Sequence, residues 1–209
     1  MVTRDTLIDM LNKIAETIIE NKEFLTDLDA AIGDGDHGIN MDKGFRAVIE
    51  KLHGVKDKDC GSILKTTAMT LISTVGGASG PLYGTAFLKA SIIAKEKMEL
   101  ESEDIIRMFD EGIKGIVMRG KAKRGEKTML DSLIPAYEAL KISIEGGDTL
   151  TQAFDKASKA AYDGVEYTKT IRATKGRASY LGNRSIGHQD PGATSSYLMI
   201  KSLANFLSN

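Results

Sequence analysis

Residues 3–20 read TRDTLIDMLNKIAETIIE, and this stretch decides the fold class. Its apolar side chains recur every three or four positions, at Leu7, Ile8, Leu11, Ile14, Ala15, Ile18 and Ile19. Such spacing lines up one apolar face of an α-helix, whereas a half-buried strand alternates apolar and polar residues. Strict alternation occurs in no comparable stretch, and the other segments repeat the helical spacing. The sequence therefore predicts an all-α fold.

This spacing predicts eight helices. They cover residues 3–31, with a break near Asn21 left open, and residues 37–53, 59–75, 80–98, 103–118, 127–143, 149–169 and 191–207. Thr149 and Gln152 read as a capping box, and Asp190 reads as an N-cap because Pro191 follows it. Ser102 marks a further helix start before two acidic residues. Short connections favour antiparallel neighbours, so we expect one domain, residues 1–209, built as an up-and-down bundle or closed ring of helices.

Composition and charge exclude several classes of protein. Lys and Arg number 28 against 29 Asp and Glu, which gives a formal net charge of -1. Broad nucleic-acid binding needs a large excess of cations, so it is not expected. No apolar run approaches the roughly 20 residues that span a bilayer, and the N-terminus lacks an apolar signal core. We therefore expect a cytoplasmic protein without a membrane segment, in which the lone Cys60 is a core residue.

Glycines gather in four groups at alternate connections between the expected helices. Sixteen of the 21 glycines belong to these groups: Gly33, Gly35, Gly38, Gly44, Gly76, Gly77, Gly80, Gly84, Gly112, Gly115, Gly120, Gly125, Gly176, Gly182, Gly187 and Gly192. In an up-and-down arrangement, alternate connections share one end of the bundle. A helix cap needs a single glycine rather than three or four. We therefore expect the four loops to converge on a functional site.

The first glycine-rich loop carries three carboxylates. It reads DAAIGDGDHGIN over residues 29–40, with Asp29, Asp34 and Asp36 as its acidic members. Carboxylates this close repel one another unless a cation neutralises them. Mg²⁺ binds a few carboxylates together with phosphate oxygens, so the pattern favours one or two magnesium ions beside a phosphate. A calcium loop is excluded because Ile39 and Phe45 stand where an EF-hand needs glycine and glutamate, while an acidic solvent-exposed turn remains an alternative.

Two further loops suit a phosphate. Residues 76–84, GGASGPLYG, lead into a helix whose free backbone N–H groups can bind an anion, although they do not form a Walker A loop. Residues 176–192 form the longest stretch without helical spacing, and loops of this length are usually functional. Arg177 can pair with phosphate oxygens or serve as an ordinary surface cation, and Asp190 and Gly192 can line the site. The loops together predict a site for a magnesium–nucleotide or magnesium–phosphometabolite.

Four stretches in chain order resemble the nucleotide-binding L subunit of dihydroxyacetone kinase: residues 29–38 (DAAIGDGDHG), 76–84 (GGASGPLYG), 125–133 (GEKTMLDSL) and 176–195 (GRASYLGNRSIGHQDPGATS). The resemblance implies a closed barrel of antiparallel helices that binds ADP and Mg²⁺ at one end. It implies Asp29, Asp34 and Asp36 as the metal ligands. The positions that it places beside the nucleotide are His37, Gly38, Ile39, Asn40, Ala78, Ser79, Gly120, Met129, Arg177, Asp190, Pro191 and Gly192.

The family that this chain resembles contains single-chain kinases that consume ATP and bacterial multi-subunit systems that keep ADP as a cofactor. Because 209 residues leave no room for a second domain, the resemblance favours the multi-subunit type. It then implies a phosphohistidine-carrying subunit of the sugar phosphotransferase system as donor and a dihydroxyacetone-binding K-type subunit as acceptor. Arg177 is the one side chain expected to stabilise the transferred charge. A homodimer is compatible with the resemblance. Two alternative functions are a nucleotide-binding regulatory module and an ATP-using subunit of a related small-polyol or keto-sugar kinase.

Overall fold

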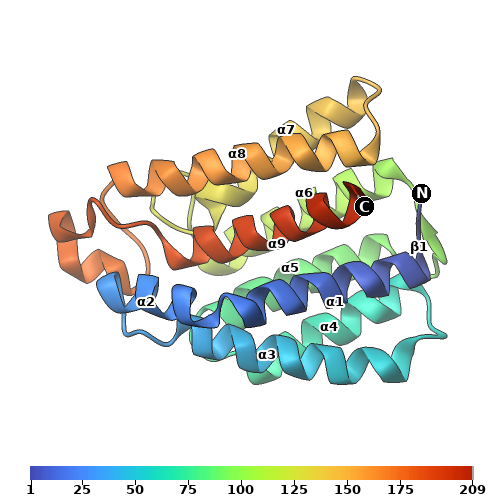
Figure 1. Cartoon of the computed structure of the whole chain (residues 1–209), viewed down its shortest axis with the longest axis horizontal. Helices are drawn as coiled ribbons and strands as arrows, with labels where there is room; N and C mark the ends of the chain where they lie inside the picture. The colour runs from blue at the N-terminus through green and yellow to red at the C-terminus, as the bar shows by residue number, and fades with distance from the viewer. Residues whose placement is uncertain (209) are drawn as a thin grey trace.

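The computed structural model describes residues 1–208 and shows an elongated bundle of helices (Figure 1). The α-helices are α1 (Arg4–Glu20), α2 (Lys22–Ile32), α3 (His37–Leu52), α4 (Cys60–Thr74), α5 (Ser79–Ile93), α6 (Ser102–Gly120), α7 (Leu130–Glu145), α8 (Leu150–Thr170) and α9 (Pro191–Ser208). Two 3₁₀ helices, η1 (His53–Val55) and η2 (Arg177–Ser185), and two short strands, β1 (Val2–Thr3) and β2 (Glu99–Leu100), complete the described elements. The predicted all-α class is confirmed.

Successive passes of the chain run in alternating directions along the long axis (Figure 1). Helices α1 and α2 share one pass, because the first expected helix breaks at Asn21, and α3 returns beside them. Each later helix packs on the one before it, and α9 packs on both α8 and α1. One large apolar cluster, drawn from all of these helices, fills the space between them. This rigid body fixes where the connecting loops lie.

Some element boundaries differ from the expected ones. Helix α5 ends at Ile93 instead of residue 98, because the chain turns at Glu96 (φ 62°) and enters β2, which pairs antiparallel with β1. Two-residue strands are too short to show an alternating pattern. Helix α7 begins at Leu130 instead of residue 127, because Lys127 has a left-handed backbone (φ 62°). The N-cap of α6 is Glu101, one residue before the expected Ser102, whereas the capping box of Thr149 is confirmed.

Eight of the sixteen grouped glycines lie inside α-helices, seven of them within the ranges that were expected to be helical and one, Gly120, beyond the expected end of its helix. These are Gly38, Gly44, Gly80, Gly84, Gly112, Gly115, Gly120 and Gly192. Several of them serve close packing: a Cβ at Gly44 would lie 2.1 Å from Val75 Cγ2, and a Cβ at Gly80 would lie 2.2 Å from the Val75 carbonyl oxygen. Only a residue without a side chain lets α3 and α5 approach the end of α4 this closely.

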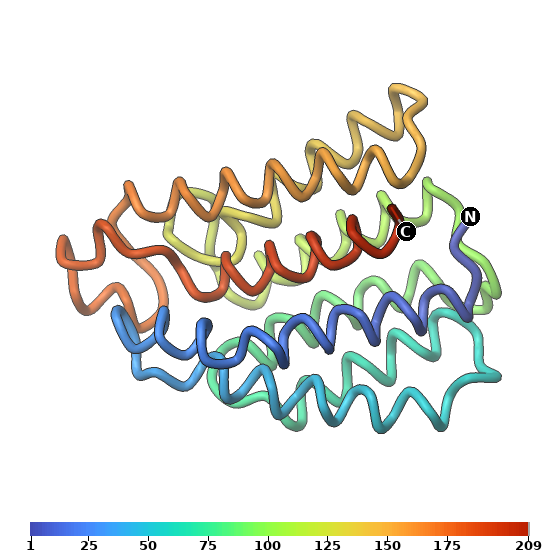
Figure 2. The backbone as a smooth tube through the Cα atoms, in the orientation of Figure 1, coloured from blue at the N-terminus to red at the C-terminus, as the bar shows by residue number. Residues whose placement is uncertain are grey.

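The loops nevertheless meet in two sets at opposite ends of the bundle. The loops after α2, α4, α6 and α8 lie at the left end in Figure 2. The loops after α3, α5 and α7 lie at the right end, beside β1 and the last turn of α9. The four connections that carry the grouped glycines therefore share one end, as predicted.

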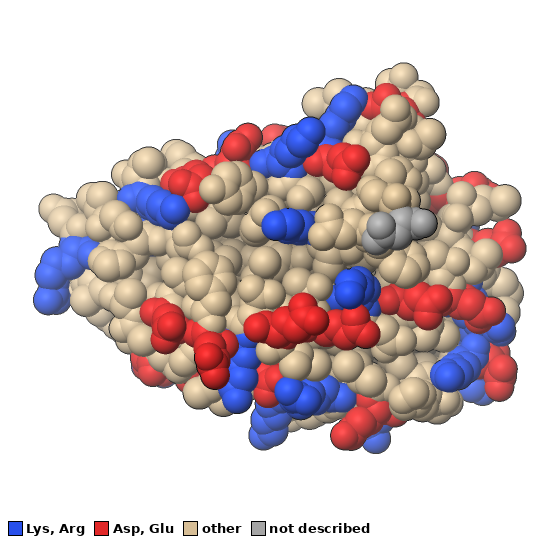
Figure 3. Space-filling model, viewed as in Figure 1, with Lys and Arg blue, Asp and Glu red and all other residues tan. Residues whose placement is uncertain are grey.

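The face of the molecule seen in Figure 3 carries charges of both signs. A row of acidic side chains crosses its middle, and basic side chains are scattered above and below the row. This face lacks the continuous basic surface that broad nucleic-acid binding needs. Within residues 1–208, no helix has the length and apolar character required to cross a membrane.

Helices α7 and α8 are in backbone contact at Gly164, and this contact generates a prediction. A Cβ there would lie 2.1 Å from the Asp131 carbonyl oxygen and 2.8 Å from Ser132 Cα. Gly164→Ala should therefore lower the free energy of unfolding by about 1–3 kcal/mol, as overpacking does, in urea denaturation. The control is Gly112→Ala in α6, where the nearest atom to a Cβ is 3.4 Å away. It should be neutral or stabilising by about 1 kcal/mol. Equal stability of the two variants would contradict the prediction.

Candidate functional site

An open pocket lies where the four loops meet. It encloses about 930 Å³ of space between the loops, part of which is open to solvent. All four connections contribute to its lining, which confirms that the loops converge. The predicted site residues that line it are Asp29, Asp34, Asp36, His37, Asn40, Ala78, Ser79, Met129, Arg177, Asp190, Pro191 and Gly192. The structure thus brings together most of the residues that the sequence singled out.

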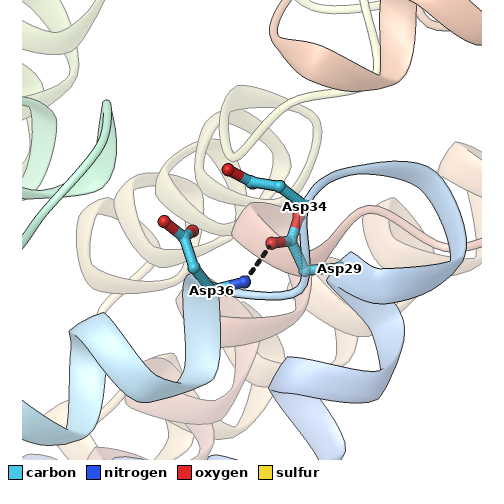
Figure 4. A group of neighbouring side chains, drawn as sticks. All are labelled: Asp29, Asp34 and Asp36. Atoms are coloured by element: carbon cyan, nitrogen blue, oxygen red, sulfur yellow. Dashed lines mark hydrogen bonds between the residues drawn. The ribbon is translucent and has the colours of Figure 1, made fainter.

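The three predicted metal ligands form one cluster in this pocket. Each offers a carboxylate oxygen, and these three oxygens lie within 4.8 Å of one another. Figure 4 shows Asp34 and Asp36 on the tight turn between α2 and α3, and Asp29 on the last turn of α2. Asp29 Oδ2 accepts hydrogen bonds from the backbone N–H groups of Asp36 (2.9 Å) and His37 (3.2 Å), which orients its carboxylate. Gly35 makes the turn possible with a φ of 72°.

Arg177 connects the last loop to the acidic cluster. Its Nη2 lies 2.9 Å from Asp34 Oδ2. The Arg177 side chain is 66% exposed, and an ion pair this open to water stabilises a fold only weakly. The guanidinium is therefore available to an anion in the pocket. Its position beside a carboxylate argues against the reading of Arg177 as an isolated surface cation.

The part of the lining that precedes α5 suits a negatively charged group. Residues Gly76, Gly77 and Ala78 lead into α5, whose N-terminus has no side-chain cap. The first N–H groups of a helix have no partner within the helix, and the helix dipole makes this end attractive to anions. Asn40 packs against the loop, because a Cβ at Gly76 would lie 2.8 Å from its Oδ1. Anion-binding backbone therefore faces the pocket that also contains the carboxylates.

His37 is held inside the wall by hydroxyl groups. Its Nδ1 lies 3.0 Å from Ser79 Oγ and its Nε2 lies 2.9 Å from Ser195 Oγ. Burial lowers the pKa of His37 to about 4, so its ring is neutral at neutral pH. The Tyr83 hydroxyl continues the network beyond Ser195. Sequence reasoning did not single out Tyr83 or Ser195 for a role, since their partners lie far away in the chain.

Lys127 is a second feature that sequence reasoning missed. Its side chain is 1% exposed, and Nζ donates to the carbonyl oxygens of Thr168 (2.6 Å) and His188. A third carbonyl oxygen, that of Ile171, lies 3.4 Å away. Burial lowers the pKa of Lys127, while the nearby charges of Asp190 and Asp131 oppose this shift. Lys127 thus joins the loop before α7 to both ends of the loop before α9.

Asp190 begins α9 as the sequence predicted. Its Oδ2 accepts a 2.7 Å hydrogen bond from the Ala193 N–H, and burial raises its pKa to about 7. The turn that follows lies against the start of α7, since a Cβ at Gly192 would lie 3.6 Å from the Met129 nitrogen. The start of α9 and the residue before α7 therefore form one continuous side of the pocket.

Three predicted nucleotide contacts are not part of the pocket lining. A Cβ at Gly38 would lie 2.0 Å from the Lys22 carbonyl oxygen, so this glycine faces α2. Ile39 is 50% exposed. Gly120 ends α6 beside Leu82, which does line the pocket. Their roles beside a nucleotide stay predictions, as do those of the residues that line the pocket.

Comparison with known proteins gives consistent matches along the chain. Residues 31–205 match the family model described as the DAK2 domain. The "PEP-dependent dihydroxyacetone kinase, ADP-binding subunit DhaL" of Escherichia coli is 47% identical over 203 residues, which cover 97% of each chain. The "PTS-dependent dihydroxyacetone kinase, ADP-binding subunit DhaL" of Lactococcus lactis is 44% identical over 203 residues, again 97% of each chain.

A solved structure shares the fold. It is the dihydroxyacetone kinase of C. freundii in complex with AMP-PNP and Mg²⁺, with a TM-score of 0.75 and 23% identity. The match covers 96% of this chain and 34% of that one. The family model and the full-length relatives agree on one assignment. This chain belongs to the DAK2 domain family.

Proposed function

We propose that this chain is the ADP- and magnesium-binding subunit of a dihydroxyacetone kinase. It relays a phosphoryl group from a phosphohistidine-carrying donor protein, through bound ADP, to dihydroxyacetone held on a partner subunit. The observation that carries the proposal is the pocket that unites three carboxylates with an uncapped helix N-terminus. Two relatives that align over 97% of their length are named ADP-binding subunits of such kinases, which supports it.

The residues present fit magnesium. Asp29, Asp34 and Asp36 supply oxygen ligands only, which are the ligands that hard divalent cations prefer. Asp29 is already oriented by two backbone N–H groups, so its carboxylate does not need to reorganise. When bound, Mg²⁺ supplies the positive charge that neutralises phosphoryl oxygens during transfer.

The pocket also fits the diphosphate of ADP. The N–H groups at the start of α5 can bind phosphate oxygens without any basic side chain. Ser79 and Asn40 contribute polar groups beside them, and Arg177 can add a planar pair of donors. We propose that the remaining predicted positions contact the nucleotide further out: His37, Gly38, Ile39, Ala78, Gly120, Met129, Asp190, Pro191 and Gly192.

Catalysis by such a site depends on positioning and charge. In phosphoryl transfer the protein stabilises negative charge on the transferred group and holds donor and acceptor in line. We assign the stabilisation of this negative charge to the side chain of Arg177. Its guanidinium is exposed at the edge of the pocket, so it can reach a phosphoryl group on a partner protein.

The surroundings of the site are also part of the proposal. The packing of α9 on both α1 and α8 supports a closed barrel of antiparallel helices, with residues 1–209 acting as a single unit. The names of the relatives support a dihydroxyacetone-binding K-type subunit and a phosphotransferase-system protein as partners. Both partners must reach the pocket end, because that is where the carboxylates and the free N–H groups lie.

Removal of a single carboxylate tests the binding site. Asp34→Ala and Asp36→Ala should each weaken MgADP binding by about tenfold or more in isothermal titration calorimetry, since each loses a charged ligand. Asp155→Ala on the exposed face of α8 is the matched control and should bind as the wild type does. Unchanged affinity in both site variants would contradict the assignment of the cluster.

Reconstitution tests the relay. The wild-type chain, mixed with MgADP, a K-type subunit and a phosphohistidine donor protein, should form dihydroxyacetone phosphate, detected by a coupled dehydrogenase assay. Arg177→Gln should lower the rate by about tenfold or more, because the transferred charge loses a donor. A chain that binds MgADP but forms no product with active partners would favour a regulatory module instead.

A further inference from the structure

The loop that carries Arg177 has little apolar packing of its own. It spans residues 171–190 between α8 and α9, at the left end of the molecule in Figure 1, and we call it the Arg177 loop. The apolar cluster to which it contributes is small and separate from the large one: Ile32, Ala173, Ala178 and Leu181. The ion pair between Arg177 and Asp34 is too exposed to hold a loop in place. The position of the Arg177 loop therefore depends on its other polar contacts.

The ammonium group of Lys127 binds both ends of the Arg177 loop. Its Nζ donates to the carbonyl oxygen of Ile171 at the start of the loop (3.4 Å) and to that of His188 near the end. It also donates to the Thr168 carbonyl oxygen in the last turn of α8 (2.6 Å). One buried cation thus joins the two ends of the loop to each other and to the helical body.

Two further hydrogen bonds hold the loop beside Lys127. The carbonyl oxygen of Glu126, the preceding residue, accepts a hydrogen bond from the Thr174 N–H (3.3 Å). Thr168 Oγ1 accepts one from the Asp190 N–H (3.0 Å). The contacts that fix the start and the end of the Arg177 loop are therefore gathered around a single ammonium group.

Lys127 lines the pocket, so a direct contact with a phosphate is the alternative role. An ammonium group has three donors, and three carbonyl oxygens face this one. The Lys127 side chain is also buried. No donor is left for a phosphate oxygen, so any effect of Lys127 on the reaction is exerted through the loop.

We propose that Lys127 is a positioning residue for Arg177. By holding the two ends of the Arg177 loop together, it keeps the guanidinium at the pocket edge in the place that phosphoryl transfer requires. A charged donor makes stronger hydrogen bonds than a neutral one, which suits a contact that replaces apolar packing. The inference rests on the proposed function, because that function gives Arg177 its role.

Amide hydrogen exchange tests the anchoring without nucleotide or partners. Lys127→Met nearly keeps the length of the side chain and removes the ammonium group. In the full chain, the N–H groups of Ala173, Thr174 and Asp190 should exchange about tenfold faster in nuclear magnetic resonance spectra, because the loop opens locally. N–H groups in the middle of α8 and α9 should keep their exchange rates.

Lys169→Met is the matched control. Lys169 lies in the last turn of α8, and its Nζ contacts the Glu166 carboxylate (2.6 Å) rather than the loop. The substitution leaves the Lys169 carbonyl oxygen, which accepts the Gly187 N–H, in place. Exchange in the Arg177 loop should therefore be the same as in the wild type.

A double-mutant cycle tests whether Lys127 acts through Arg177. With saturating MgADP and active partners, Lys127→Met should lower the relay rate by about 3- to 10-fold, and by no more than Arg177→Gln does. In the double variant, the Lys127 substitution should add no further loss, because the misplaced group is already absent. Multiplied losses in the double variant would overturn the inference.

The other outcomes separate this inference from the proposed function. A wild-type chain that forms no product with active partners overturns the proposed function and, with it, the role of Lys127 in the reaction. Product formation by the wild type, together with unchanged exchange in Lys127→Met, overturns the inference alone. Faster exchange throughout α8 and α9, or a Lys127→Met chain that does not fold, also overturns it, because Lys127 would then hold the fold rather than the loop.

Discussion

Electrostatic repulsion among Asp29, Asp34 and Asp36 is the constraint around which the pocket end is built. Three carboxylate oxygens within 4.8 Å of one another are unfavourable unless positive charge or N–H donors face them. The structure provides both, through the backbone of the turn before α3 and through Arg177. The glycine-rich turn therefore keeps like charges together, which fits the magnesium site proposed above.

The helical body and the loops contribute differently to this end. Glycines inside helices bring backbones into contact, as Gly164 does between α7 and α8, and this contact gives the loops a fixed base. The buried ammonium group of Lys127 then joins the carbonyl of Thr168, in the last turn of α8, to the loop carbonyls of Ile171 and His188. A cation that is satisfied by backbone oxygens fixes loop geometry without using a carboxylate, so the acidic cluster stays free for an ion.

The sequence predicted those features of the structure that are determined by residues close together in the chain. The helical spacing of residues 3–20, the Asp190 N-cap and the acidic turn are all encoded within a few residues, and the structure has each of them. Contacts between distant residues were not predictable. A packing glycine such as Gly80 has the same sequence signature as a loop glycine. Tyr83 and Ser195 meet across 112 positions, which no spacing rule relates.

The division of the loops between two ends has a practical consequence. The turn between α7 and α8 lies at the end remote from the pocket, and at Gly147 a side chain would meet no atom within 4 Å. Exposed turns of this kind accept inserted sequence with little effect on the body. A reporter peptide spliced in at Gly147 would let the chain be followed by fluorescence while its opposite pole stays open to other proteins.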